Sequence, residues 1–114
     1  MSKLGPASQK IQRFIQIQTA IYDREKALEI AEELIKTRLA ACIQILGPAE
    51  SFYTWKGKLV KDKEFVLIIK TKEKLYEDVE GMIKKMHPYK VPEILALDIN
   101  FGSKKYLEWL EKVI

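Results

Sequence analysis

Few side chains in this sequence could bind a metal ion. Met86 and His87 are consecutive and directly precede Pro88, and Cys42 is the one cysteine among 114 residues. Imidazole suits Cu(II), Zn(II) and Ni(II), whereas a thioether suits Cu(I), so His87 is a candidate metal ligand. The alternative is that a lone histidine beside a proline caps a helix or bonds across an interface. Met86, four residues after Met82, would then belong to a hydrophobic core.

The polar residues do not form a set that indicates catalysis. A Ser–His–Asp arrangement would have to use the single histidine for all proton transfer. Acylphosphatases need a loop of backbone donors with an arginine and an asparagine, but no glycine-rich loop precedes an arginine here, and Asn100 is the one asparagine. No phosphate loop or dinucleotide fingerprint is present. We therefore expect a protein that works by binding and is not an enzyme.

The charge pattern disfavours nucleic acid and membrane as partners. The chain has 20 basic and 16 acidic residues, a net charge of +4, and the two signs are interleaved. Residues 64–70 are mainly aliphatic and lack the glycines of an RNA-recognition strand. The apolar runs are too short to span a bilayer, and the first residues lack the apolar segment of a signal peptide. With one cysteine, which suits a reducing compartment, we expect a cytoplasmic protein.

The first half of the sequence predicts a strand, a helix and a second strand. Residues 1–10 are polar and predict a disordered N-terminal tail, and residues 11–114 predict one domain. Residues 14–18 alternate like a strand, and Asp23 suits the N-cap of a helix. That helix should bury Ala27, Leu28, Ala31, Leu34 and Ile35. Residues 39–45 form the next short apolar run and predict a strand.

The second half predicts a hairpin, two helices and a last strand. Residues 51–55 and 65–69 are strand-like and flank Gly57, so two long strands should pair as a hairpin around that glycine. Thr71 could cap a helix that ends before Pro88. Residues 94–99 predict the last strand, and Gly102 and Ser103 lead into a C-terminal helix. The buried positions of the two helices should be Leu75, Val79, Met82, Ile83 and Met86, then Tyr106, Leu107, Leu110 and Val113.

This order predicts an α+β fold of the ferredoxin-like split βαβ type, β-α-β-β-α-β plus a C-terminal helix. In such a fold both helices cover one face of the sheet. The strands here are apolar on both faces, because Phe65, Leu67 and Ile69 alternate with Val66 and Ile68. An exposed apolar sheet face promotes aggregation unless something covers it. Identical subunits are the simplest cover, so the pattern predicts a homo-oligomer.

The residues also resemble a known family, CutA, whose members are associated with tolerance of divalent cations. The similarity runs from about residue 14 to the end and rests on five segments in the same order and spacing. They are Arg38-Leu39-Ala40-Ala41-Cys42, Tyr53-Thr54-Trp55-Lys56-Gly57, Lys70-Thr71, His87-Pro88-Tyr89-Lys90-Val91-Pro92-Glu93 and Tyr106-Leu107-Glu108-Trp109-Leu110. The resemblance implies a homotrimer similar in shape to the PII signalling trimers.

The resemblance also implies divalent cations, copper above all, as ligands. The family's bacterial copper pattern uses a cysteine on the first strand and two consecutive histidines before Pro-Tyr. The cysteine position falls on Gln18, the first histidine position on Met86 and the second on His87. No cofactor is required, and Cu(II) or another divalent cation is the candidate ligand. Of the three ligand positions in the copper pattern, only His87 keeps the pattern's residue type.

A cleft between subunits is the other place where the resemblance implies binding. Its candidate residues are Gln18, Trp55, Lys70, Met86, Tyr89 and Glu93. The aromatic side chains could equally serve packing at an interface, and Lys70 and Glu93 could form a structural ion pair. If Lys70 faces the cleft, it favours an anionic ligand. The alternative function is thus a PII-like signalling trimer that binds a small anionic effector between subunits.

Overall fold

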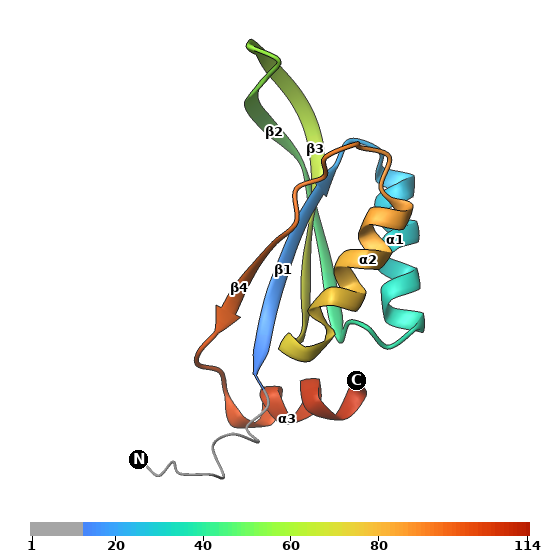
Figure 1. Ribbon diagram of the computed structural model, residues 1–114. Coiled ribbons are helices and arrows are strands. Elements are labelled where there is room, and N and C mark those ends of the chain that lie inside the picture. The colour runs from blue at the N-terminus through green and yellow to red at the C-terminus, as the bar shows by residue number, and fades with distance from the viewer. Residues whose placement is uncertain (1–12) are drawn as a thin grey trace.

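The computed structural model describes residues 13–114, so the expected tail at residues 1–10 lies outside the described residues. Its elements follow the predicted order (Figure 1). They are strand β1 (Phe14–Ile21), helix α1 (Arg24–Lys36), strands β2 (Cys42–Trp55) and β3 (Lys58–Lys72), the 3-10 turn η2 (Glu73–Leu75), helix α2 (Tyr76–Met86), strand β4 (Leu95–Ile99) and helix α3 (Lys104–Val113). Within residues 13–114 no helix has the length and apolarity needed to cross a membrane.

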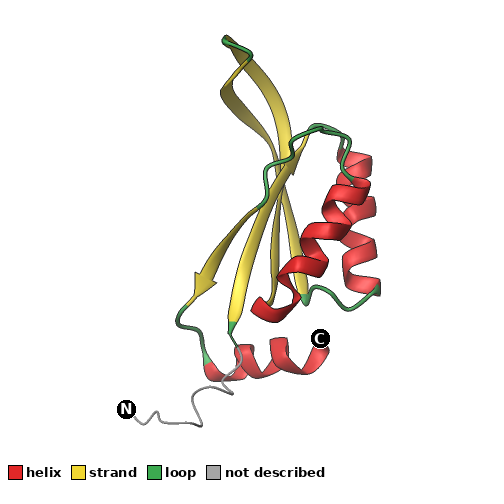
Figure 2. Cartoon of the chain, viewed as in Figure 1, coloured by secondary structure: helices red, strands yellow, loops and turns green. Residues whose placement is uncertain are grey.

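The four strands form one antiparallel sheet in the order β2-β3-β1-β4. Helices α1 and α2 lie together on one face of this sheet, and α3 lies at the end of the sheet where β1 begins (Figure 2). The two long strands β2 and β3 continue well beyond the helices as a projecting hairpin. This mixed α+β arrangement confirms the predicted element order.

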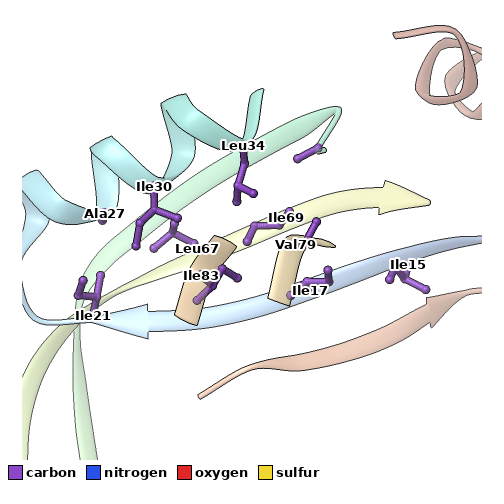
Figure 3. Packing of buried hydrophobic residues seen from close by; sticks show 11 residues of the cluster. Ile15, Ile17, Ile21, Ala27, Ile30, Leu34, Leu67, Ile69, Val79 and Ile83 are labelled. Atoms are coloured by element: carbon purple, nitrogen blue, oxygen red, sulfur yellow. The ribbon is translucent and has the colours of Figure 1, made fainter. Parts of the chain in front are cut away.

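The core lies between the sheet and the two helices (Figure 3). Side chains at alternate positions of β1 and β3 meet buried positions of α1 and α2, and all are nearly inaccessible: Ile15, Ile17, Ile21, Leu67, Ile69, Ala27, Ile30, Leu34, Val79 and Ile83. Burying one such aliphatic side chain stabilises the fold by about 1.5–3 kcal/mol. The buried stripe of α1 runs through Ile30, while Ile35, predicted to be inside, is 43% exposed. Tyr106 of α3 was also predicted inside and is exposed; Leu110 alone of that helix is fully buried.

Local signals in the sequence correctly located the first helix and the hairpin turn. The Asp23 carboxylate accepts from the backbone N–H groups of Glu25 and Lys26 at 3.0 and 3.3 Å, as an N-cap does. Lys56 and Gly57 both adopt positive φ between the paired residues Trp55 and Lys58. This two-residue turn matches the twist of the flanking strands, and a glycine accommodates it at little steric cost.

Two predicted boundaries were wrong. Thr71 does not cap a helix, because β3 runs through it to Lys72 and α2 begins only after η2. The Thr71 side chain is buried and its hydroxyl donates to the carbonyl of Leu39 at 2.6 Å. The second strand begins at Cys42 and not at Leu39, since the backbone N–H of Leu39 still bonds to Leu34 at the end of α1.

Apart from α3 at one end, the sheet face opposite α1 and α2 has no helix over it, and it carries apolar side chains beside polar ones such as Gln16, Gln18 and Lys70 (Figure 1). On this face Val66 lies beside Ala20 on one side and Leu46 on the other. Leu46, Leu95 and Leu97 are each more than half exposed. Residues 65–69 of β3 are thus apolar on both faces, as the sequence predicted, and the face opposite the helices is largely uncovered in the single chain.

Candidate functional site

The ring of His87 is held by hydrogen bonds at both nitrogens. His87 follows the last residue of α2 and is 7% exposed. Its Nε2 lies 2.8 Å from the carbonyl oxygen of Ala20, and its Nδ1 accepts from the backbone N–H of Tyr89 at 3.1 Å. Because a carbonyl can only accept, the proton of the neutral imidazole is on Nε2. A metal ion could bind Nδ1 only by displacing the Tyr89 N–H.

Tyr89 connects this histidine to the end of β1 and to β3. Its ring packs edge-on against His87 and parallel to the ring of Tyr22, with centroids 4.5 and 5.9 Å away. Its hydroxyl accepts from the backbone N–H of Tyr22 at 3.0 Å and donates to the Glu64 carboxylate at 2.8 Å. Burial, followed by the hydrogen bond to Glu64, raises the pKa of Tyr89 above its usual range. Tyr89 therefore stays protonated and acts as a fixed hydrogen-bond donor.

Beside Tyr89 lies a pocket of about 820 Å³, between the arm of the hairpin (residues 51–64) and the segment that follows α2. Its walls are mainly aromatic and acidic. The aromatic residues are Tyr22, Phe52, Tyr53, Trp55 and Tyr89; the acidic residues are Asp62, Glu64 and Glu93. Lys90 is the one basic residue in the lining. Such a size and such walls are typical of small-molecule sites.

Hydrogen bonds within the wall fix the directions of its polar groups. Tyr53 donates to Asp62 at 2.6 Å, and this bond is the main reason why the pKa of Tyr53 is raised. Gln18 of β1 donates through Nε2 to the Glu93 carboxylate at 2.8 Å. The Glu64 carboxylate is the most buried of the three, with the residue 7% exposed. Each of the three carboxylates thus accepts from an uncharged donor.

Four of the predicted cleft residues come together here. Trp55, Tyr89 and Glu93 line the pocket, and Gln18 joins them through its bond to Glu93. Lys70 lies elsewhere on the sheet, where its ammonium donates to Gln44 at 3.3 Å. Met86 packs, half-buried, against the core.

The sequence analysis missed Tyr22, Asp62 and Glu64 as lining residues. Asp62 and Glu64 belong to a polar run in the hairpin, which by itself indicates only a solvated arm. A sharper signal was that Glu64 directly precedes the alternating buried positions of β3. A carboxylate at that position could be buried and not solvated. The backbone of Gly47 in β2 lies close to that of Glu64, because a Cβ atom at Gly47 would lie 2.8 Å from the carbonyl oxygen of Glu64.

The described residues do not form a complete metal site within one chain. No three His, Cys, Asp or Glu side chains gather closely enough in residues 13–114 to surround an ion. Cys42 is a free, half-buried thiol on β2. A closed metal site would therefore need donors from more than one copy of the chain.

Comparisons with known proteins give one consistent result. The family model described as CutA1 divalent ion tolerance protein matches residues 15–113. The divalent-cation tolerance protein CutA of Thermus thermophilus is 42% identical over 88 residues, which cover 77% of this chain and 85% of that protein. The crystal structure of CutA1 from Oryza sativa has a TM-score of 0.86 and 40% identity, covering 89% of this chain and 93% of that one.

A plant relative is longer than this chain. The chloroplastic protein CutA of Arabidopsis thaliana is 41% identical over 97 residues, which cover 85% of this chain and 53% of that protein. This chain thus spans about half the length of that relative. Nearly all the residues described, including the helices, the hairpin and the pocket, fall inside the family match. The chain belongs to the CutA1 divalent ion tolerance family.

Proposed function

We propose that this chain is a cytoplasmic homotrimeric binding protein that acts in the response to divalent cations, and that it catalyses no reaction. The observation that carries the proposal is the family match over residues 15–113, together with relatives named for divalent-cation tolerance. That name describes tolerance of ions and not a reaction. The lone free thiol of Cys42 is compatible with a reducing compartment.

The uncovered sheet face supports self-association. Leu46, Leu95 and Leu97 expose apolar area on one continuous face, and the hairpin projects beyond the helices where it could reach a neighbour (Figure 1). Burial of apolar area contributes about 25 cal/mol per Å² to association, so this face favours self-association. We propose a ferredoxin-like subunit in a trimer of the PII type.

Cu(II) or another divalent cation is the ligand we propose, with His87 as a donor. Binding through Nδ1 would break one hydrogen bond, from Tyr89, while the bond from Nε2 to Ala20 would keep the ring oriented. A retained second hydrogen bond of this kind is usual for metal-bound imidazole. Gln18 and Met86 occupy the positions where the copper pattern has a cysteine and a histidine. Because those two ligands are missing, we expect weaker binding than at a closed site.

Two measurements test this function. Native mass spectrometry of the purified chain should give three times the protomer mass, and a monomer or dimer would refute the trimer. Calorimetric titration with Cu(II) should show saturable binding that His87→Ala abolishes and the matched control Met86→Leu retains. Copper uptake that does not saturate, or that His87→Ala leaves unchanged, would refute the role of His87.

An anionic effector is less well supported in the pocket. Three carboxylates and one lysine line it, and Lys70, the residue that would have favoured an anion, lies elsewhere. We therefore do not propose the signalling alternative for this site.

A further inference from the structure

We propose that the aromatic and acidic pocket binds a small organic cation, one that carries an ammonium or guanidinium group. This inference goes beyond the divalent-cation function and requires neither a metal nor His87. It rests on the charge of the pocket, on the burial of Glu64 and on the aromatic walls.

The charge of the lining is the first argument. Asp62, Glu64 and Glu93 face one lysine, Lys90, around a single pocket. The ion pairs of the described residues involve other side chains, and none of them neutralises these three carboxylates. The pocket therefore attracts positive charge.

The burial of Glu64 is the second argument. It lines the pocket although it is 7% exposed, and its carboxylate accepts one hydrogen bond, from the neutral Tyr89 hydroxyl. Buried carboxylates are normally paired with a cation, because removing the charge from water is costly. A positively charged ligand in the pocket would supply that missing partner.

The aromatic walls favour an organic cation over a bare metal ion. A metal ion needs several donors at short range, and the acidic side chains of the described chain do not gather in that way. The aromatic lining, which includes Tyr22, Trp55 and Tyr89, instead offers π density together with apolar area, and this combination suits an alkylated ammonium or a guanidinium. The ammonium of Lys61 already lies 5.7 Å from the centroid of another lining ring, Phe52.

Choline and its uncharged carbon analogue 3,3-dimethyl-1-butanol are suitable probes, because they differ in charge and hardly in shape. The intact protein in its solution oligomer would be titrated with each at constant ionic strength, by calorimetry and by NMR of the aromatic side chains. We expect saturable binding of choline, and also of methylguanidinium, and at least about tenfold weaker binding of the alcohol. No binding of either cation, or equal binding of choline and the alcohol, would overturn the proposal.

Variants locate the site. Glu64→Gln removes the charge but keeps an oxygen that can accept from Tyr89, so it should fold and bind choline about tenfold more weakly. Trp55→Leu should also weaken binding. Glu32→Gln, on the exposed side of α1, is the matched control and should change nothing. Unchanged affinity in both Glu64→Gln and Trp55→Leu would place any binding outside this pocket and overturn the proposal.

The same preparations separate this inference from the divalent-cation function. Cu(II) titration of Glu64→Gln should match that of the unmodified chain, whereas His87→Ala should lose copper. If copper binds and choline does not, the inference alone fails. If choline binds and copper does not, the divalent-cation function alone fails.

Discussion

Two buried threonines on the same sheet face offer a matched test of the packing between the sheet and the helices. Thr19 in β1 and Thr71 in β3 are both 0% exposed. The Thr71 hydroxyl donates to the carbonyl of Leu39 at 2.6 Å. The Thr19 hydroxyl has no hydrogen-bond partner within the part of the chain that the structure describes. Replacing each with valine, which has nearly the same shape, should therefore have opposite effects.

The magnitudes follow from the cost of an unpaired hydroxyl. A buried hydroxyl without a partner costs about 1–3 kcal/mol, so Thr19→Val should raise the free energy of unfolding by about 1–2 kcal/mol. Thr71→Val removes a hydrogen bond and leaves the Leu39 carbonyl without that donor, so it should lower the same quantity by about 1–2 kcal/mol. For a domain of this size, 1 kcal/mol corresponds to a shift in Tm of about 4 °C.

Guanidinium chloride unfolding of the two variants and the unmodified chain would measure this. Protomer concentration must be equal in all samples, because the stability of an oligomer depends on it. The slope of the free energy against denaturant should stay the same while the midpoint moves. A Thr19→Val variant that is less stable than the unmodified chain would refute the reasoning, since it would mean that the hydroxyl has a partner in solution.

Three further predictions concern pH, assembly and the close backbone approach at Gly47. Because the pKa of Tyr89 is raised in the folded chain from an unfolded value of about 10, its contribution to stability is complete below pH 10 and is lost as pH rises above it. Tyr89→Phe should reduce this loss of unfolding free energy at alkaline pH, as measured by denaturant titration at several pH values. An unchanged loss would show that Tyr89 is not its cause. Leu97→Asp places a charge on the uncovered face and should shift native mass spectra toward monomer, whereas the exposed control Glu32→Gln should not; an unchanged trimer would contradict our assignment of that face. Gly47→Ala should destabilise the chain by about 1–3 kcal/mol in denaturant titrations, because φ is +144° and the new Cβ would lie 2.8 Å from a backbone oxygen; a neutral effect would show that the strand relaxes freely.

Features that depend on near neighbours in the chain could be predicted from the sequence. The Asp23 cap, the turn at Gly57 and the end of α2 before Pro88 each follow from side-chain chemistry within a few residues. The alternation of Phe65 to Ile69 correctly indicated that both faces of β3 are apolar. Residue patterns also led to the right family, because the matching segments keep their order and spacing.

The pocket depended on tertiary structure. Tyr22 and Tyr89 are 67 residues apart and Gln18 and Glu93 are 75 apart, and only the register of β1 within the sheet brings them into contact. The sequence placed Lys70 and Glu93 together in one candidate cleft, yet within the chain Lys70 bonds to Gln44 elsewhere on the sheet and only Glu93 lines the pocket. Thr71 looked like a helix cap, but pairing with β1 extended the strand through it. Local propensity is worth tenths of a kcal/mol per residue, whereas the buried contacts of a sheet are worth several, so where the two disagreed the sheet decided.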